Sequence, residues 1–215
     1  MINPAQVAEN YERVRAEIVT IAGAERAATI QIVAVTKTHG VEAAIAAAAC
    51  GCDAVGENYA QEAVSKFAET KPLPLHFIGH VQSNKVRSLA PIVDVWQTVD
   101  TAGLAREIAK RAPGAQVMLQ VNISGEGSKS GCAPGEVADL LELCVDQGIN
   151  ATGLMTIAPL NAGSVATGQC FKSLRSLADT LGLVDCAMGM SSDFAIAVAE
   201  GATVLRLGTI LFGAR

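Results

Sequence analysis

The stretch "IQIVAVTKTHGVEAAIAAAAC", residues 30–50, places a short β-branched run directly before an alanine-rich run with helical spacing. Isoleucine and valine are typical of strands, whereas alanine is the best helix former. A strand over 30–36 followed by a helix over 41–50 is the unit from which parallel sheets are built, because parallel strands need a crossover connection. Whether this unit repeats decides the fold.

Seven further runs of the same kind follow, at 53–56, 75–79, 93–99, 116–122, 149–156, 184–190 and 202–208. Stretches with helical spacing occur at 41–50, 59–69, 83–89, 101–111, 134–147, 167–181 and 193–200. Another helix, over 4–22, precedes the first strand, with Asn3 suited to its N-cap and Pro4 to its first turn. The pattern predicts an α/β fold, a single (β/α)₈ TIM-type barrel with an extra N-terminal helix that takes in residues 1–215. A doubly wound open sheet is the alternative.

Composition excludes several classes of protein. Half of the 215 residues are hydrophobic, and the formal net charge is -5 with 16 scattered Lys and Arg, so we expect no nucleic-acid partner. The longest apolar segment, residues 41–56, is too short to cross a bilayer and contains Asp53. The N-terminus carries Glu9, Glu12 and Glu17, unlike a signal peptide. We therefore expect a cytoplasmic protein with no membrane partner.

The six cysteines are expected to be free thiols, because a large core in a reducing compartment needs no disulfides. Cys50 and Cys52 form the only close pair in the sequence, and none of the three histidines lies near a cysteine. Zinc sites usually combine such residues at short, regular spacings. The sequence therefore predicts no metal site.

Functional side chains of such barrels lie at the carboxyl ends of the strands and in the loops that follow. The first strand ends at Lys37, on the same side as Val33 and Val35, since side chains alternate along a strand. A lysine amine at a barrel mouth is a nucleophile suited to an aldehyde. The alternative is an ordinary surface lysine that leaves the strand.

Polar residues also follow the second, third and sixth strands. They are Glu57, Asn58, His80, Gln82, Asn84 and Thr156. The alternative is a set of caps and turns, in which Ser83 would cap the next helix.

Small and hydroxyl residues follow the last two strands. Ser191 and Ser192 come after the seventh strand, and Gly208 with Thr209 comes after the eighth. Loops of this kind on adjacent barrel strands typically bind a phosphate through backbone N–H groups. The alternative is plain helix capping by Ser191 and tight packing at Gly208.

An arginine stands in the apolar run of the eighth strand. Arg206 alternates with Val204, so it points into the barrel, while Leu205 and Leu207 face the helices. A buried guanidinium needs a partner, because an unpaired buried charge is costly. We expect an acceptor atom of a ligand, the alternative being an internal salt bridge to an acidic residue such as Asp100.

Pyridoxal 5'-phosphate is a ligand that would fit the lysine amine, the phosphate-binding loops and the buried arginine together. Its aldehyde would form an imine with Lys37, its phosphate would sit on Ser191, Gly208 and Thr209, and its pyridine nitrogen would face Arg206. A barrel aldolase that forms an imine with a sugar phosphate shares the lysine and the phosphate loops. It explains Arg206 less well.

Seven segments of this chain resemble the pyridoxal 5'-phosphate homeostasis protein family, which is similar to the N-terminal barrel domain of alanine racemase. They are "AVTKTHG", "VGENYAQE", "HFIGHVQSNK", "VNISGEGSKSG", "GLMTIAP", "GMSSDF" and "VLRLGTILFGAR". The resemblance covers residues from about Ile30 to Arg215, in order and at natural spacing.

The resemblance implies cofactor-binding roles. These are the imine for Lys37, the pyridine nitrogen for Arg206, the phosphate for Ser191, Gly208 and Thr209, and the lining of the cofactor for Asn58, His80 and Met155. The family usually has leucine at the position of Val81 and often proline at that of Gly40, neither of which is an expected contact.

The resemblance further implies a monomer that buffers or delivers the cofactor, with apo-enzymes as partners, and that affects amino-acid and keto-acid balance without robust catalysis. An arginine opposite the pyridine nitrogen disfavours its protonation and weakens the ring as an electron sink. Weak racemase activity is the alternative. Racemases add a second base, a tyrosine from a separate C-terminal domain, and neither Tyr11 nor Tyr59 matches it; we expect no such domain after Arg215.

Overall fold

A closed barrel of parallel strands, paired in sequence order, forms the centre of the computed structural model, which describes residues 2–69, 71–127, 129–159 and 162–213. The strands are β1 Gln31–Val35, β2 Ala54–Glu57, β3 Leu75–Phe77, β4 Val95–Val99, β5 Gln116–Gln120, β6 Asn150–Met155, β7 Asp185–Ala187 and β8 Val204–Leu207. Strand β8 closes the barrel by pairing with β1, where Val33 lies opposite Arg206. The predicted barrel is confirmed, and the open sheet is wrong.

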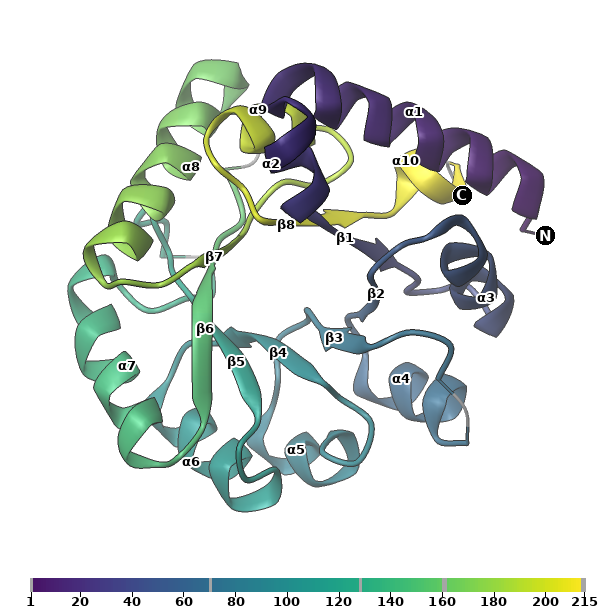
Figure 1. Ribbon diagram of the computed structural model, residues 1–215. Helices are drawn as coiled ribbons and strands as arrows, with labels where there is room; N and C mark the ends of the chain where they lie inside the picture. The colour runs from purple at the N-terminus through teal and green to yellow at the C-terminus, as the bar shows by residue number, and fades with distance from the viewer. Residues whose placement is uncertain (1, 70, 128, 160–161, 214–215) are drawn as a thin grey trace.

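Helices surround the strands in Figure 1. They are α1 Pro4–Ala22, α2 Ala24–Thr29, α3 Val41–Cys50, α4 Ala60–Phe67, α5 Ser83–Leu89, α6 Ala102–Arg111, the 3₁₀ helix η1 Pro134–Glu136, α7 Val137–Asp146, α8 Gly163–Thr180, α9 Phe194–Ala199 and α10 Thr209–Phe212. Helices α2 and α10 are not predicted from the sequence, because helices of six and four residues show no periodicity. Helix α8 begins at Gly163, four residues before the predicted start at 167.

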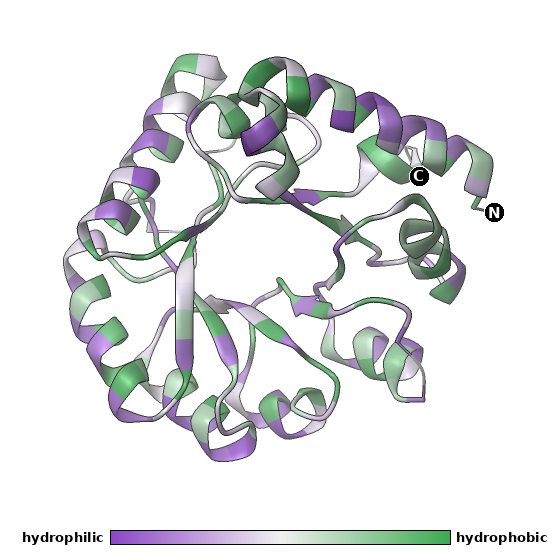
Figure 2. Cartoon of the chain, in the orientation of Figure 1, coloured by the Kyte–Doolittle hydropathy of each residue, from purple (hydrophilic) through white to green (hydrophobic). Residues whose placement is uncertain are grey.

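The N-terminal helix covers the seam where the barrel closes. Asn3 caps α1 as predicted, since its Oδ1 accepts from the N–H of Ala5 at 3.2 Å. Asn10 Nδ2 donates to the carbonyl of Leu211 in α10 at 2.9 Å, and α1 also packs against α3 and α9. Figure 1 shows purple α1 beside yellow α10, and Figure 2 shows hydrophobic and hydrophilic residues alternating along α1. The helix thereby ties the last unit of the barrel to the first.

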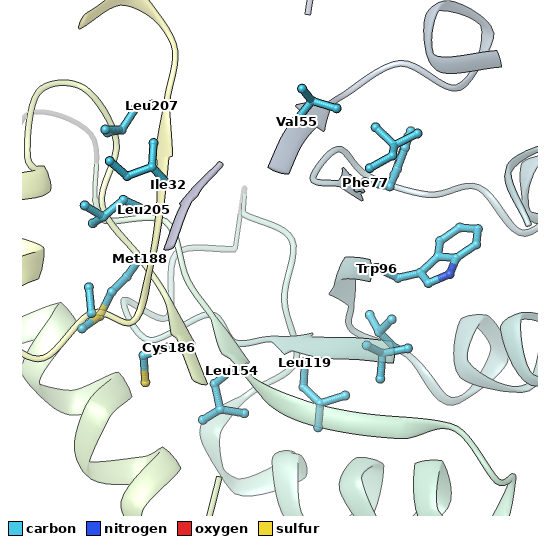
Figure 3. Close-up of a cluster of buried hydrophobic side chains, with 14 of the residues drawn as sticks. Ile32, Val55, Phe77, Trp96, Leu119, Leu154, Cys186, Met188, Leu205 and Leu207 are labelled. Carbon is cyan, nitrogen blue, oxygen red and sulfur yellow. The ribbon is translucent and has the colours of Figure 1, made fainter. Parts of the chain in front are cut away.

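Two apolar layers follow from the alternation of side chains along each strand. The layer between strands and helices includes Ile32, Val55, Phe77, Trp96, Leu119, Leu154, Cys186, Leu205 and Leu207, drawn in Figure 3. The layer inside the barrel comprises Val33, Ala54, Val95, Met118, Met155, Ala187 and Val204. The predicted orientation of the eighth strand is confirmed, because Val204 is inside and Leu205 outside.

Two aspartates, one directly before β2 and one directly before β4, bind backbone N–H groups at the amino-terminal end of the barrel. Asp53 Oδ2 accepts from the N–H of Ile32 at 2.7 Å, and Asp94 Oδ2 accepts from that of Leu75 at 2.6 Å. Asp53 thus divides the apolar segment 41–56 into α3 and β2. Within the four described ranges, no helix is long and apolar enough to cross a membrane.

Candidate functional site

The carboxyl ends of β1 and β8 lie side by side, so the turn that carries Lys37 is next to the loop that follows β8. Lys37 is half-buried in the turn after β1, two residues beyond Val35, the last residue of that strand. Gly208 lies against the same strand, since a Cβ added to it would stand 3.4 Å from Val35 Cβ. An alanine at 208 would therefore be in van der Waals contact with β1.

Arg206 lies inside the barrel and is only 4% exposed. Its Nη2 donates to the carbonyl of Thr156 at 2.8 Å, whereas its Nη1 has no hydrogen-bond partner among the described residues. Burial lowers the pKa of the Arg206 guanidinium to about 10, opposed in part by the charge of Asp193. The guanidinium is therefore still a cation at neutral pH, with one N–H group left without an acceptor in this part of the chain.

The internal salt bridge that we considered for Arg206 is not formed. Within the described ranges Arg206 takes part in no ion pair, and Asp100 Oδ2 instead accepts from the N–H of Gly131 at 3.2 Å. Asp100 directly follows β4, whereas Arg206 lies in β8, and these strands are not neighbours in the barrel. Their separation around the barrel is the reason that the sequence alternative fails.

Ser191 joins the loops after β7 and β8. Its Oγ accepts from the N–H groups of Gly208 and Ile210, both at 3.2 Å. The alternative of plain helix capping is wrong, because Asp193 occupies the N-cap position of α9 and no side chain caps that helix. The structure thus brings two of the predicted phosphate residues together, with Thr209 exposed beside them.

A glycine makes the turn after β7 possible. Gly189 has a φ of 93°, in the region that favours glycine, and an added Cβ would lie 2.6 Å from Ala197 Cβ. The Gly189 carbonyl accepts from the N–H of Arg206 at 3.0 Å. The loop that carries Ser191 is therefore held against β8.

Asn58 and His80 lie elsewhere around the mouth. Both line a cavity of about 250 Å³, together with Gly79, Thr98, Gln120, Asn122 and Lys129. Asn58 Oδ1 is buried without a hydrogen-bond partner in the described part of the chain. The predicted lysine, arginine and phosphate residues do not line this cavity, so the structure divides the expected contacts into two neighbouring groups.

Met155 lies deeper, fully buried inside the barrel. It ends β6, and the next residue, Thr156, offers its carbonyl to Arg206. The Thr156 hydroxyl donates to the carbonyl of Val121 at 2.8 Å and so does not face the mouth. Met155 forms part of the floor below Arg206.

Three of the polar residues predicted at strand ends have other surroundings. Glu57 is fully buried and bonds Thr36 Oγ1 and Lys66 Nζ outside the barrel. Gln82 and Asn84 are exposed at the start of α5. Gln82, not Ser83, occupies the N-cap position of that helix, which has no side-chain cap, so the predicted cap is wrong.

Two charged residues of α4 near the mouth were not singled out from the sequence. Lys66 Nζ pairs with Glu62 Oε1 at 2.5 Å and with buried Glu57 at 2.8 Å. The Glu62–Lys66 spacing of i and i+4 predicts a pair on one helix face. Nothing in the spacing predicts the third partner, because Glu57 reaches the pair only through the packing of α4 on β2.

Metal ligation finds no support in the residues described. Within these four ranges, no three His, Cys, Asp or Glu side chains are grouped closely enough to hold an ion. The six cysteines are free thiols, and all but Cys50 are buried.

Known proteins match this chain over nearly its whole length. The model of the family described as alanine racemase, N-terminal domain, matches residues 2–215. A pyridoxal phosphate homeostasis protein of Pseudomonas aeruginosa is 43% identical, over 97% of this chain and 96% of that protein. A protein of the same name from Vibrio alginolyticus is 41% identical over 87% of each chain.

Solved structures give the same result. PipY of Synechococcus elongatus, solved with PLP bound, has a TM-score of 0.82 and 33% identity, covering 96% of this chain and 100% of that chain. An alanine racemase of Clostridium difficile has a TM-score of 0.80 at 16% identity, and the match covers 100% of this chain and 58% of that chain, which is a likeness of fold. The family model and the identity of 43% over 97% of this chain show that the chain belongs to the family of pyridoxal phosphate homeostasis proteins.

Proposed function

We propose that this protein binds pyridoxal 5'-phosphate at the barrel mouth and takes part in the homeostasis of that cofactor, by buffering or delivering it. The observation that carries the proposal is Nη1 of Arg206, a buried charged donor without an acceptor in the described residues. Such a group is costly to leave unsatisfied. A pyridine nitrogen is an uncharged acceptor of suitable size, and it would remove that cost.

The other contacts follow from the strand ends. The amine of Lys37 would hold the cofactor's aldehyde carbon as an imine, and Ser191, Gly208 and Thr209 would bind its phosphate. Ser191 Oγ accepts from the N–H groups of Gly208 and Ile210, so the backbone donors that a phosphate needs point to one place. Asn58, His80 and Met155 would line the remaining sides.

Holding the cofactor is favoured over turnover. When bound, the cofactor supplies an electron-withdrawing ring, and the strength of that ring depends on protonation of its pyridine nitrogen. Arg206 stays cationic at neutral pH, so it disfavours a second positive charge on the nitrogen. Tyr11 donates to the carbonyl of Gly51 at 2.8 Å between α1 and α3, away from the mouth. We therefore expect little turnover, with weak amino-acid racemisation as the alternative.

The first test is the absorption spectrum of the purified protein with added cofactor, before and after borohydride reduction, followed by peptide mapping. A reduced adduct on Lys37 is expected, and it should vanish in Lys37→Ala. Lys172→Ala, at an exposed lysine of α8, is the matched control and should keep the adduct. Equal adduct yields in wild type and Lys37→Ala would refute the proposed imine.

Two further assays separate the competing functions. Deuterium exchange at the α carbon of a panel of amino acids detects racemase-like or transaminase-like turnover, and the proposal expects none above that of Lys37→Ala. Sugar phosphates should not compete with the cofactor for Lys37. Efficient competition would favour an aldolase that forms its imine with a sugar phosphate.

We also propose that the protein is a cytoplasmic monomer with one domain over residues 1–215, which passes the cofactor to apo-enzymes and has no nucleic-acid or membrane partner. The net charge of -5 and the scattered basic residues support this view. Light scattering measures the mass in solution. Transfer to an apo-enzyme, with and without a scavenger of free cofactor, distinguishes delivery by contact from release; complete loss of transfer with the scavenger would refute direct delivery.

A further inference from the structure

A buried charged network lies outside the barrel, directly behind the segment that carries Lys37. Glu57 Oε1 accepts from Thr36 Oγ1 at 2.7 Å and from Lys66 Nζ at 2.8 Å. Lys66 Nζ also donates to the main-chain carbonyl of Thr36 at 2.8 Å. Thr36, the residue before Lys37, is thus held by its side chain and its backbone.

The same lysine reaches the residue after Lys37 through a second carboxylate. Lys66 Nζ pairs with Glu62 Oε1 at 2.5 Å, and Glu62 Oε1 accepts from the N–H of Thr38. Thr38 has a φ of 64°, the only positive φ of a residue other than glycine in the described ranges. A β-branched residue rarely adopts this conformation, so its surroundings must maintain it.

The network is costly to build, which indicates that it does more than fill space. The side chain of Glu57 is 0% exposed and that of Lys66 is 10% exposed. A buried ion pair contributes little net stability compared with apolar side chains of similar size. Glu57 Oε2 is moreover buried without a hydrogen-bond partner among the described residues.

The order of residues along the chain relates this network to Lys37. Thr36, directly after β1, bonds Glu57 outside the barrel, and Lys37 follows it as the first residue of the turn at the carboxyl end of that strand. Bonds at Thr36 and Thr38 hold the backbone on both sides of that residue. A rotation of either peptide would redirect the amine.

We propose that Glu57, Lys66 and Glu62 form a positioning unit that holds the backbone of residues 36–38, so that the Lys37 amine is directed at the cofactor's aldehyde. This inference rests on the proposed function, because the direction of the amine matters only if Lys37 captures an aldehyde. The unit touches no reacting atom and acts through Lys37 alone.

Glu62→Ala is the test variant, because it removes the acceptor of the Thr38 N–H from a partly exposed position on α4 and leaves the buried Glu57–Lys66 pair in place. Glu62→Gln restores an acceptor oxygen and is the conservative rescue. Gln61→Ala, at the exposed neighbouring residue of the same helix, is the matched control.

Two measurements are made on all four proteins. Hydrogen exchange of the Thr38 amide needs no cofactor, and in Glu62→Ala it should be faster by about tenfold, the factor that corresponds to one lost hydrogen bond. The rate constant for imine formation with pyridoxal 5'-phosphate should fall by about the same factor. Both values should return toward wild type in Glu62→Gln and stay unchanged in Gln61→Ala, and all four proteins should remain folded.

The possible failures are distinguishable. If the wild type forms the imine and Glu62→Ala forms it equally fast, the positioning unit is refuted and the proposed function stands. If Glu62→Gln reacts as slowly as Glu62→Ala, the acceptor oxygen is not what matters, and the positioning unit is again refuted. If the wild type itself forms no adduct on Lys37, the proposed function fails first and this inference fails with it.

Discussion

His76 should make the stability of this protein depend on pH in a way that can be calculated. It lies on β3 between two residues of the outer layer, Leu75 and Phe77, so its ring points into the barrel, where it is 5% exposed. Its Nδ1 lies 2.7 Å from Nε2 of buried Gln97. Burial lowers the pKa of His76 to about 4, against a small opposing effect of Asp94.

The sign and size of this pH dependence follow from the difference between the pKa of His76 in the folded protein and its pKa in the unfolded chain. The ordinary pKa of histidine is 6.5. Below that pH, the unfolded chain therefore binds a proton that the buried His76 ring of the folded protein does not bind. The stabilisation from His76 is therefore complete above pH 6.5 and is lost as the pH falls toward about 4. A pKa difference of about 2.5, at 1.36 kcal/mol for each pH unit, amounts to about 3 kcal/mol.

The assay is urea unfolding of wild type and His76→Gln at a series of pH values from about 7 to about 4. Acid effects of carboxylates are common to both proteins, so the difference between their pH dependences isolates the histidine. The loss of unfolding free energy should be smaller in His76→Gln by about 3 kcal/mol. His80→Gln, at an exposed histidine, is the control and should follow wild type. Parallel pH curves for wild type and His76→Gln would refute the reasoning.

Three substitutions test other contacts. Arg206→Met should weaken cofactor binding by about tenfold or more with little change in the unfolding free energy, because removal of the unsatisfied Nη1 donor offsets loss of the Nη2 bond to Thr156; a large loss of stability would contradict this. Tyr11→Phe should lower the unfolding free energy by about 1 kcal/mol, through loss of the bond to Gly51, without changing cofactor binding. Gly79→Ala should cost about 2 kcal/mol or more and displace Asn58, since the new Cβ would stand 2.0 Å from that residue's carbonyl oxygen; unchanged denaturation would contradict this.

The alternation of side chains along each strand and the repetition of the strand–helix unit can be inferred from the sequence. Together they were sufficient to predict the barrel. Each β-branched run is short and local, and each is followed by a helical stretch, so the eight units and the inward direction of Arg206 could be inferred without any knowledge of packing. The N-cap at Asn3 was equally accessible, because a capping bond spans only two or three residues. The short helices α2 and α10 could not be predicted, since helices shorter than two turns show no periodic pattern of apolar residues.

Only the tertiary structure decided which side chains meet. Ser191 could have capped its own helix, yet its hydroxyl accepts from the N–H of Gly208 on the neighbouring loop. Arg206 bonds the carbonyl of Thr156, fifty residues earlier in the chain, instead of Asp100. Glu57 turns outward to Lys66. The physical reason is that sequence patterns report the period of a strand or helix, whereas a hydrogen bond between distant residues depends on how closed strands and covering helices bring their atoms within about 3 Å.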